Sequence, residues 1–437
     1  MITKKQEKTN WGNNTRTFPM VCTPKNYKEI SKIINDKKNF IIQGNQRSYG
    51  DVCLNNNLVI SIKNFNKITY FDKKNGIIEI ESGLLLKDLL PIVTQEGWFI
   101  PVTPGTKYVS LGGMVANNIH GKNTYKNQIK YYIKKIKLMT VNKKIILCSK
   151  KKNKKIFDLT VGGYGLSGII LTITLKLKKI YSENIDQKIV EFKNFKQFYD
   201  IIKVSRKSEY CVCWIDNFSK NKIQGLCYLG NHSKKNKYIK SKIFEEKKIS
   251  LLTLLIFRII ISNFYFPKIM NFIFRNYKKF FYKKTCHYND FFYPQDHVMD
   301  WYKIYGKKGF IQIQFLIPKK KFEKILGEIS DFLNLKKIFS GFIVIKKFNE
   351  NEKYLNFSGS GYSISFDFQI NLKYENLKLF FNNIFKKYKL KINFSKDLIT
   401  QKNNAYNYKE FVIFKKNLLT INSKKKINSL FSKRLGI

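Results

Sequence analysis

The segment 104–123, PGTKYVSLGGMVANNIHGKN, constrains the fold more than any other part of the chain. It contains four glycines, spread among small and polar side chains. Glycine lets a backbone approach another group closely, so this segment can lie against something large and flat. It ends on His120 and Lys122, two of the few side chains in this region that can take part in chemistry. A glycine-rich surface turn is equally compatible with the segment taken alone.

Two further glycine-rich loops accompany it. Residues 40–42 predict a short strand that leads into QGNQRSYGD (43–51), and GGYGLSG (162–168) leads into an apolar, β-rich segment. A glycine-bracketed polar loop after a strand can form a nest of backbone N–H groups around a phosphate, although an ordinary β-turn has the same pattern. A Rossmann fold would place one G-x-G-x-x-G directly after the first strand, with an acidic residue on the next strand, and that arrangement is missing. We interpret the three loops as walls of a site for the isoalloxazine and pyrophosphate of a flavin.

The periodicity predicts an α+β fold. The chain has 437 residues, which is enough for two domains. Short period-2 strands are predicted over 58–83. Longer strands, in which polar residues alternate with apolar ones, are predicted over 309–318 and 361–370. Helices are predicted over 322–333 and 375–390. This strand–strand–helix repetition suggests a large antiparallel sheet with helices on one side.

The net charge of +52 raises the question of an anionic partner. Only six of the 82 basic residues are arginines, and arginine is the residue favoured for bidentate contacts to phosphates and base edges. No nucleic-acid-binding motif is present, so we expect no nucleic acid partner. An anionic lipid surface or a phosphorylated substrate fits the charge better.

The cysteines and the N-terminus bear on localisation. Seven cysteines are an odd number, and their spacing predicts neither a disulfide framework nor a metal site. We therefore expect reduced thiols in a cytoplasmic protein, without a metal ion. Residues 1–14 lack the apolar core of a signal peptide, and no run of about 20 apolar residues predicts a transmembrane helix.

Residues 249–274, ISLLTLLIFRIIISNFYFPKIMNFIF, are the most apolar part of the chain. Arg258, Pro267 and Lys268 interrupt the stretch, and basic residues follow it. An apolar segment with such flanks is typical of an element that lies in a membrane interface. A pair of core helices in the second domain is the alternative, and the sequence leaves both open.

The longest motifs resemble a known family. RSYGD (47–51), PVTPGT (101–106), LGGMVANNIHGKN (111–123) and VGGYGLSGII (161–170) are similar, in order and spacing, to FAD-dependent oxidoreductases of the vanillyl-alcohol-oxidase type. Within that type, the chain most resembles the decaprenylphosphoryl-β-D-ribose 2′-oxidase family, over nearly its whole length.

The resemblance implies a two-domain fold with a PCMH-type FAD-binding domain. This domain is expected to span 1–183, and a substrate-binding domain built on an antiparallel sheet 184–390. Residues 391–437 are expected to return to the FAD-binding domain.

The same resemblance implies non-covalent FAD, because the loop 43–51 lacks the histidine to which many members of the superfamily attach the flavin. An aromatic family position near the flavin falls on Asn393. The residues expected to contact FAD are Ile42, Gln43, Gly44, Asn45, Gln46, Arg47, Ser48, Tyr49, Gly50, Asp51, Gly105, Ser110, Leu111, Gly112, Gly113, Asn117, Asn118, Ile119, His120, Ile170 and Asn393.

The implied reaction moves a hydride from ribose C2 of a polyprenyl-phosphoryl-β-D-ribose to flavin N5. The product is a 2-keto sugar, and the step is the first half of an epimerisation that makes the arabinose donor for cell-envelope glycans. The catalytic residues implied are Lys396, His120, Lys122 and Tyr49, and the substrate residues are Gln312, Gln314, Lys346, Ser363, Ser365 and Trp214. From the residues alone, His120 has a weaker alternative as a core histidine whose hydrogen bonds are satisfied, and the two glutamines one as exposed residues of a strand.

Ser365 stands where some family members carry a cysteine. Loss of that thiol puts covalent inhibition in doubt, but not the oxidation itself.

The resemblance also implies partners. They are a lipid-linked sugar phosphate, a separate NADH-dependent keto-reductase and the surface of the inner membrane. A soluble aldono-lactone or alcohol oxidase of the same superfamily is an alternative, and it would not need the apolar stretch 249–274. A non-enzymatic membrane-surface binding protein is a third possibility, against which the glycine loops argue.

Overall fold

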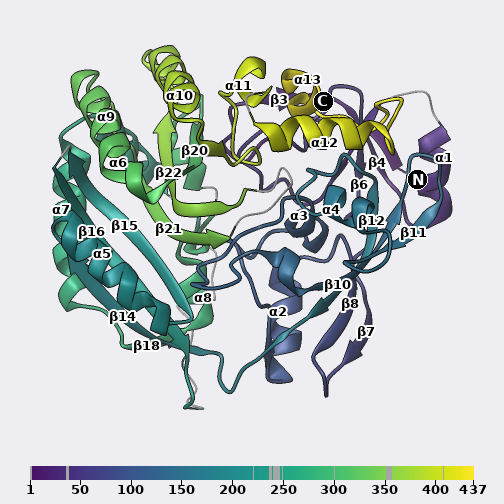
Figure 1. Ribbon diagram of the computed structural model, residues 1–437, viewed down its shortest axis with the longest axis horizontal. Coiled ribbons are helices and arrows are strands. Elements are labelled where there is room, and N and C mark those ends of the chain that lie inside the picture. The colour runs from purple at the N-terminus through teal and green to yellow at the C-terminus, as the bar shows by residue number, and fades with distance from the viewer. Residues whose placement is uncertain are drawn as a thin grey trace.

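The computed structural model describes residues 2–35, 39–219, 221–235, 239, 247–248, 250–299, 301–350, 357–406 and 408–437. The chain forms two lobes that face each other (Figure 1). The strands of the first lobe lie before residue 180, and those of the second lobe between 184 and 392. The last helices, yellow in Figure 1, lie over the first lobe.

The first lobe contains two main sheets. Its helices and strands are β1 (Ile2–Lys5), β2 (Lys8–Thr9), β3 (Arg16–Thr17), β4 (Met20–Thr23), α1 (Tyr27–Asn35), β5 (Phe40–Gln43), β6 (Leu58–Ser61), β7 (Ile68–Asp72), β8 (Ile77–Glu81), α2 (Leu86–Gln95), β9 (Trp98–Phe99), α3 (Leu111–Ala116), β10 (Ile133–Met139), β11 (Ile145–Cys148), α4 (Lys154–Thr160), β12 (Ile169–Lys176) and β13 (Lys178–Lys179). One sheet has the order β1-β4-β6-β5, in which β4 and β5 run parallel to β6. The other, β11-β10-β12-β8-β7, is antiparallel. Two of these strands border the glycine-rich loops: β5 leads into the loop 43–51, and the loop 162–168 leads into β12.

The second lobe is built on a large antiparallel sheet, as the sequence predicts. It has eight strands in the order β18-β14-β16-β15-β21-β22-β20-β23. Its elements are β14 (Asn184–Phe192), α5 (Phe195–Val204), β15 (Tyr210–Ser219), β16 (Lys222–His232), β17 (Lys247–Lys248), α6 (Leu251–Ser262), α7 (Phe266–Phe280), β18 (Thr285–His287), α8 (Tyr288–Phe292), β19 (Val298–Met299), β20 (Phe310–Ile317), α9 (Phe322–Leu335), β21 (Ile343–Glu350), β22 (Gly359–Gln369), α10 (Tyr374–Tyr388) and β23 (Lys391–Ile392).

One face of this sheet carries the core of the lobe. Phe198 of α5 stacks on Phe322 of α9, and Phe381 of α10 lies against Phe366 of β22. All four side chains are fully buried. Because side chains alternate along a strand, the polar residues between these apolar positions point to the opposite face. That face looks toward the first lobe.

The C-terminal segment packs on the first lobe. It contains α11 (Lys402–Tyr406), α12 (Lys409–Leu419) and α13 (Leu430–Leu435). Ile427 forms a parallel bridge with Phe40, the first residue of β5. The chain end therefore borders the strand that leads into the loop 43–51.

The apolar stretch predicted over 249–274 forms α6 and the first part of α7; Ile249 lies outside the described residues. No single helix in the described part of the chain is long and apolar enough to cross a membrane. By length and composition, α6 and α7 would reach that size only together, and they are bent by 109° relative to each other. Most of their large apolar side chains are exposed, so the core-helix interpretation is wrong.

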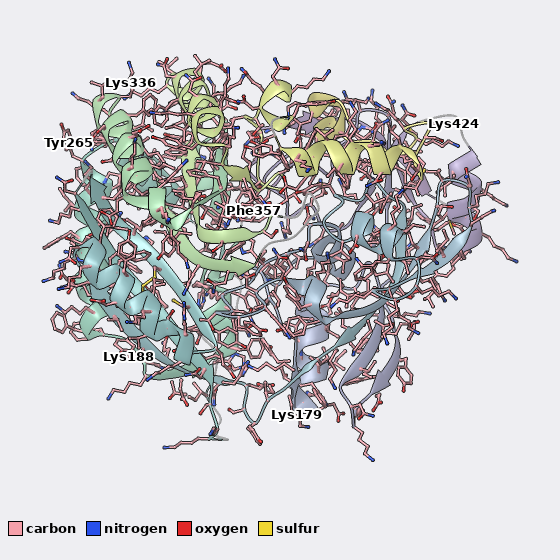
Figure 2. All side chains as sticks on the ribbon, in the orientation of Figure 1. Lys179, Lys188, Tyr265, Lys336, Phe357 and Lys424 are labelled. Atoms are coloured by element: carbon pink, nitrogen blue, oxygen red, sulfur yellow. A yellow bond between two sulfur atoms is a disulfide. The ribbon has the colours of Figure 1, made fainter. Side chains whose placement is uncertain are left out.

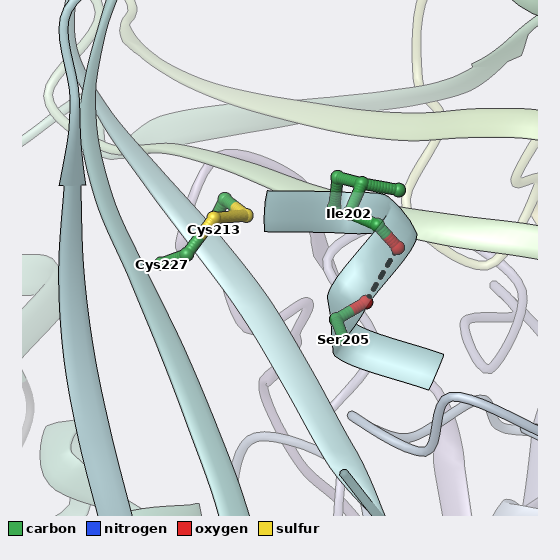
Figure 3. Close-up of a disulfide and its surroundings, with 4 residues drawn as sticks. All are labelled: Ile202, Ser205, Cys213 and Cys227. Atoms are coloured by element: carbon green, nitrogen blue, oxygen red, sulfur yellow. Dashed lines mark hydrogen bonds between the residues drawn. A yellow bond between two sulfur atoms is a disulfide. The ribbon is translucent and has the colours of Figure 1, made fainter. Parts of the chain in front are cut away.

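Cys213 and Cys227 form a disulfide (Figure 3). The expectation that all cysteines are reduced thiols is therefore wrong for this pair. The register of β15 and β16 places the two residues directly opposite each other, with Cα atoms 4.0 Å apart. Which residues lie opposite each other depends on how β15 and β16 pair in the folded protein, so the spacing of the cysteines in the sequence did not reveal this disulfide.

Candidate active site

A cavity of about 740 Å³ lies between the two lobes. One side is lined by the loops around residues 42–53, 104–122 and 164–170, and the other by β20, β21 and β22. Phe357, which lines the cavity, lies in the middle of the molecule in Figure 2. The three glycine-rich loops thus meet at one place, although they are distant in the sequence.

Most of the residues predicted for the site line this cavity. They are Ile42, Gly44, Asn45, Gln46, Arg47, Ser48, Tyr49, Gly105, Ser110, Gly112, Gly113, Asn117, Asn118, Ile119, His120, Lys122, Ile170, Trp214, Gln312, Gln314, Lys346, Ser365, Asn393 and Lys396.

Five predicted residues lie behind the lining: Gln43, Gly50, Asp51, Leu111 and Ser363. Asp51 instead forms an ion pair with Arg434, with 3.0 Å between nitrogen and oxygen. Ser363 accepts a hydrogen bond of 2.8 Å from Gln314, and Leu111 belongs to the apolar core. These residues hold the lining in place and do not face the cavity.

The loop after β5 contains a backbone conformation that is compatible with an anion-binding turn. Gln46 adopts a positive φ of 50°, and such a residue can turn successive N–H groups toward one point. The loop is braced at both sides: Asn45 donates a hydrogen bond of 2.6 Å to the carbonyl of Tyr108, and the Arg47 guanidinium lies 4.1 Å from the centre of the Trp11 ring. The loop is therefore fixed where a phosphate would enter.

The glycines of the other two loops leave space for a flat ligand. A Cβ atom at Gly105 or Gly165 would meet no atom within 4 Å, so both residues face the open cavity. At Gly112, in contrast, a Cβ atom would lie 2.8 Å from Ser82, so this glycine allows α3 to pack closely. The buried side-chain oxygen of Asn117 has no hydrogen-bond partner among the described residues. The open glycines and this unsatisfied acceptor fit a large ligand with flat rings and hydrogen-bond donors.

Three lysines meet at the other end of the cavity. Burial lowers the pKa of Lys396 to about 8 and that of Lys122 to about 7. The pKa of Lys346 is well below its usual range because of burial and, secondly, the charges of Lys396 and Lys122. The Lys396 ammonium lies 5.4 Å from the centre of the Tyr49 ring, and Lys122 donates to the carbonyl of Phe291. Such a group of amines would gain charge on binding an anion.

A neutral histidine lies beside the lysines. Burial, followed by the charges of Lys346 and Lys396, holds the pKa of His120 well below its usual value. Its Nε2 is 3.1 Å from the amide nitrogen of Gln314, whose oxygen accepts a hydrogen bond of 2.8 Å from Asn393. The buried Nδ1 of His120 has no partner within the described part of the chain. The ring is therefore fixed by one nitrogen, and the donor amide at Nε2 places the ring proton on Nδ1, whose hydrogen bond is unsatisfied.

Asp367 is a site residue that the sequence reasoning did not select. It lies opposite Gln312 in the register of β20 and β22 and accepts a hydrogen bond of 2.6 Å from its amide. Burial raises the pKa of Asp367 to about 7. Asp367 does not line the cavity, and it acts by holding Gln312, which does. Its position two residues after Ser365 on one strand was the available signal.

Aromatic residues at the end of α7 were also missed. Phe274, Tyr277 and Phe281 line the same cavity as Lys396. Phe274 makes an edge contact with Trp214 of β15, with 5.2 Å between ring centres. The cavity therefore has a polar end near the lysines and an apolar end at α7.

Comparison with known proteins agrees with this geometry. Residues 18–149 match the model of the FAD binding domain family. The chain is 26% identical, over 395 residues and 82% of both chains, to decaprenylphosphoryl-beta-D-ribose oxidase of Mycolicibacterium smegmatis. It is 29% identical to D-lactate dehydrogenase of Anaerostipes hadrus over 34% of this chain and 33% of that one. It is 23% identical to L-gulonolactone oxidase of Bos taurus over 38% of this chain and 39% of that one.

The predicted α+β fold of the vanillyl-alcohol-oxidase type is thus confirmed, and so is the resemblance to decaprenylphosphoryl-ribose oxidases. The cofactor is FAD, as predicted. The cavity fits it, because the braced turn at Gln46 can receive the pyrophosphate and the open glycines Gly105 and Gly165 leave room for the rings. Non-covalent attachment stays a prediction.

A leucine at Gly105 should block FAD without harming the fold. The new side chain would meet no protein atom near its Cβ, but it would fill space that the cofactor needs. We expect Gly105→Leu to weaken FAD binding at least about tenfold, as titrated by flavin fluorescence quenching, with the apoprotein melting temperature unchanged. Gly105→Ala is the matched control and should bind FAD normally. Normal FAD binding by the leucine variant would place the cofactor elsewhere.

Proposed function

We propose that this FAD-dependent oxidoreductase oxidises the C2 hydroxyl of a polyprenyl-phosphoryl-β-D-ribose to the 2-keto sugar. The observation that carries the proposal is the composition of the cavity. It combines an FAD cradle, three half-buried lysines and an apolar end at α7. A substrate with a sugar, a phosphate and a hydrocarbon chain has one part for each of these regions.

The lysines supply recognition of the phosphate. Lys346, Lys396 and Lys122 have lowered pKa values because burial disfavours their charged forms. An entering phosphodiester would favour protonation of these amines and pair with them. The energy of this pairing would hold the sugar against the cofactor.

The neighbouring polar side chains would orient the sugar. When bound, FAD supplies a hydride acceptor. Gln312 and Gln314 present amides to the cavity, and both are held by partners on β22. His120 is neutral and accepts from the Gln314 amide through Nε2, so its Nδ1 carries the ring proton and can donate a hydrogen bond to a sugar oxygen. Tyr49 keeps its proton, since burial and then nearby carboxylates raise its pKa, and it can therefore donate a hydrogen bond.

The oxidised sugar would need a second enzyme. A 2-keto group becomes the epimeric alcohol only when a hydride is added to the opposite face. A separate NADH-dependent keto-reductase would supply that step and complete the conversion to an arabinose donor for cell-envelope glycans.

An aldono-lactone oxidase is the second candidate. The similarity to L-gulonolactone oxidase of Bos taurus supports it. A neutral lactone, however, offers no anion for the three lysines and no chain for the apolar end of the cavity. A non-enzymatic binding protein is the weakest candidate, because it would not need the FAD cradle.

Flavin reduction tests the proposal directly. The purified holoenzyme is mixed without oxygen with polyprenyl-phosphoryl-β-D-ribose, and the flavin absorbance is followed. We expect rapid bleaching and a 2-keto product. L-Gulono-1,4-lactone is the comparison substrate: bleaching by the lactone alone would favour the second candidate, and bleaching by neither compound would contradict both.

The reaction should slow at alkaline pH. The pKa of Lys396 is lowered to about 8, so the ammonium is charged below that pH and becomes neutral as the pH rises through it. If this charge holds the substrate, kcat/KM for the sugar phosphate should fall about tenfold for each pH unit above the pKa. Lys396→Arg is the control, since a guanidinium stays charged and any activity that remains should not show this decline. A constant kcat/KM up to about pH 10 would contradict the role of Lys396.

A further inference from the structure

We propose that α6 and α7 form a docking surface for an anionic lipid bilayer, and that the active-site cavity opens beside it. The docking surface stands on the exposed side chains of the two helices. Its use for substrate delivery rests on the proposed function.

The outer side of both helices is apolar. Leu251 and Leu252 of α6 are 86% and 69% exposed, and Ile269 and Ile273 of α7 are 55% and 54% exposed. Many of their neighbours on the same helices are exposed large apolar residues as well. An exposed apolar area that covers two adjacent helices marks an interaction site.

The polarity of α7 is inverted relative to a helix that faces water. Arg275 points toward the sheet, is only 7% exposed, and pairs with Asp216 at 2.7 Å and Glu191 at 3.4 Å. Lys279 pairs with Glu191 at 3.0 Å. A soluble helix packs its apolar side inward, whereas α7 packs a charged side inward and turns its apolar side out. Rotation of the helix would leave Asp216 buried without its partner, so the ion pairs fix this orientation.

The charge of the segment identifies the occupant. Residues 250–284 contain seven lysines and arginines and no aspartate or glutamate. Arg275 and Lys279 pair with the sheet, which leaves five for an anionic surface. Apolar side chains that insert between lipids and basic side chains that meet the headgroups are the signature of an interfacial element at an anionic membrane. A second copy of this surface would bring like charges together, which disfavours self-association through it.

The cavity connects this surface to the site. Phe274, Tyr277 and Phe281, at the end of α7, line the same cavity as His120 and Lys396. A hydrocarbon chain anchored in the bilayer can therefore follow the aromatic side chains while its phosphate reaches the lysines. The substrate would not need to leave the membrane completely.

Vesicle binding tests the inference. Full-length holoenzyme is sedimented with phosphatidylglycerol vesicles and, separately, with phosphatidylcholine vesicles. We expect preferential binding to phosphatidylglycerol and a loss of about tenfold or more in Ile269→Glu/Ile273→Glu, whose two positions do not line the cavity. The matched control is Leu335→Glu/Leu372→Glu, which makes the same charge change at sites that are 77% and 99% exposed. It should bind like the unmodified protein.

A second measurement separates this inference from the proposed function. The Ile269→Glu/Ile273→Glu variant should oxidise a ribose phosphate with a short, water-soluble chain normally and a long-chain substrate in vesicles slowly. Normal vesicle binding by this variant would overturn the inference and leave the sugar oxidation untouched. If the unmodified protein proves to be a dimer and the variant a monomer that binds vesicles normally, the surface belongs to a second copy and the inference is overturned. If the unmodified protein binds vesicles but oxidises neither substrate, the proposed function is contradicted and only the docking surface is supported.

Discussion

Replacing Lys396 by alanine should leave FAD bound but lower turnover of the sugar phosphate about 100- to 1,000-fold, the effect typical of removing one group that stabilises developing charge. Lys396 lies in the turn after β23, where its backbone N–H bonds the carbonyl of Asn393 at 3.0 Å. Its ammonium reaches the cavity near Tyr49. A cation at this point can attract the phosphate and favour negative charge on a reduced flavin.

FAD binding should survive the substitution, because the cofactor cradle lies in the glycine loops of the first lobe. The visible spectrum of the purified variant checks this, and rapid mixing with substrate measures the rate of flavin bleaching. Lys391→Ala is the matched control: Lys391 belongs to the same segment, but it pairs with Glu410 at 3.1 Å and does not line the cavity. Equal rates for the two variants would remove Lys396 from the reaction.

Local patterns in the sequence predicted the parts of the site that depend on the backbone. Gly105 and Gly112 were predictable because close approach and tight packing both require glycine. Gln312 and Gln314 were predictable as neighbours on one face, since side chains two apart on a strand point the same way. The large antiparallel sheet followed from the same periodicity.

Partners that are distant in the sequence could not be predicted. Asp51 lies in a polar loop that resembles a cofactor-binding loop, so the sequence placed it against FAD. Its partner Arg434 is 383 residues away, and no local pattern connects them. The orientation of α7 was hidden for a similar reason, because it depends on Arg275 meeting Asp216 on another element. Composition alone could not decide whether the apolar stretch 249–274 lies in the core or on the surface.

Replacing Arg434 by methionine should lower the stability of the protein by about 3–5 kcal/mol, as expected when one partner of a buried ion pair is removed. The guanidinium bonds both carboxylate oxygens of Asp51, at 3.0 and 3.1 Å, and one carboxylate oxygen of Asp397 at 3.2 Å. It also donates to the carbonyl of Thr400 at 2.8 Å. The variant would leave two neighbouring buried carboxylates without their cation.

The loss of these ion pairs should also disturb the active site, because Arg434 connects the loop 43–51 to the segment that carries Lys396. Asp51 ends the loop expected to hold the FAD pyrophosphate, and Asp397 directly follows Lys396. We therefore expect Arg434→Met to release FAD at a lower urea concentration than the unmodified protein, as followed by flavin fluorescence. Adding Asp51→Asn should restore part of the stability, since it removes one unpaired charge.

The control for Arg434 is an arginine whose ion pair is exposed. Arg16 pairs with Glu7 at 2.8 Å, but the two side chains are 51% and 43% exposed. Water and salt weaken such a pair, so Arg16→Met should change the stability by less than about 1 kcal/mol. If the two variants release FAD at the same urea concentration, the contacts of Arg434 do not hold the chain end to the cofactor loop. If only Arg434→Met releases it early, the last helix is part of what holds the loop 43–51 and the turn at Lys396 together.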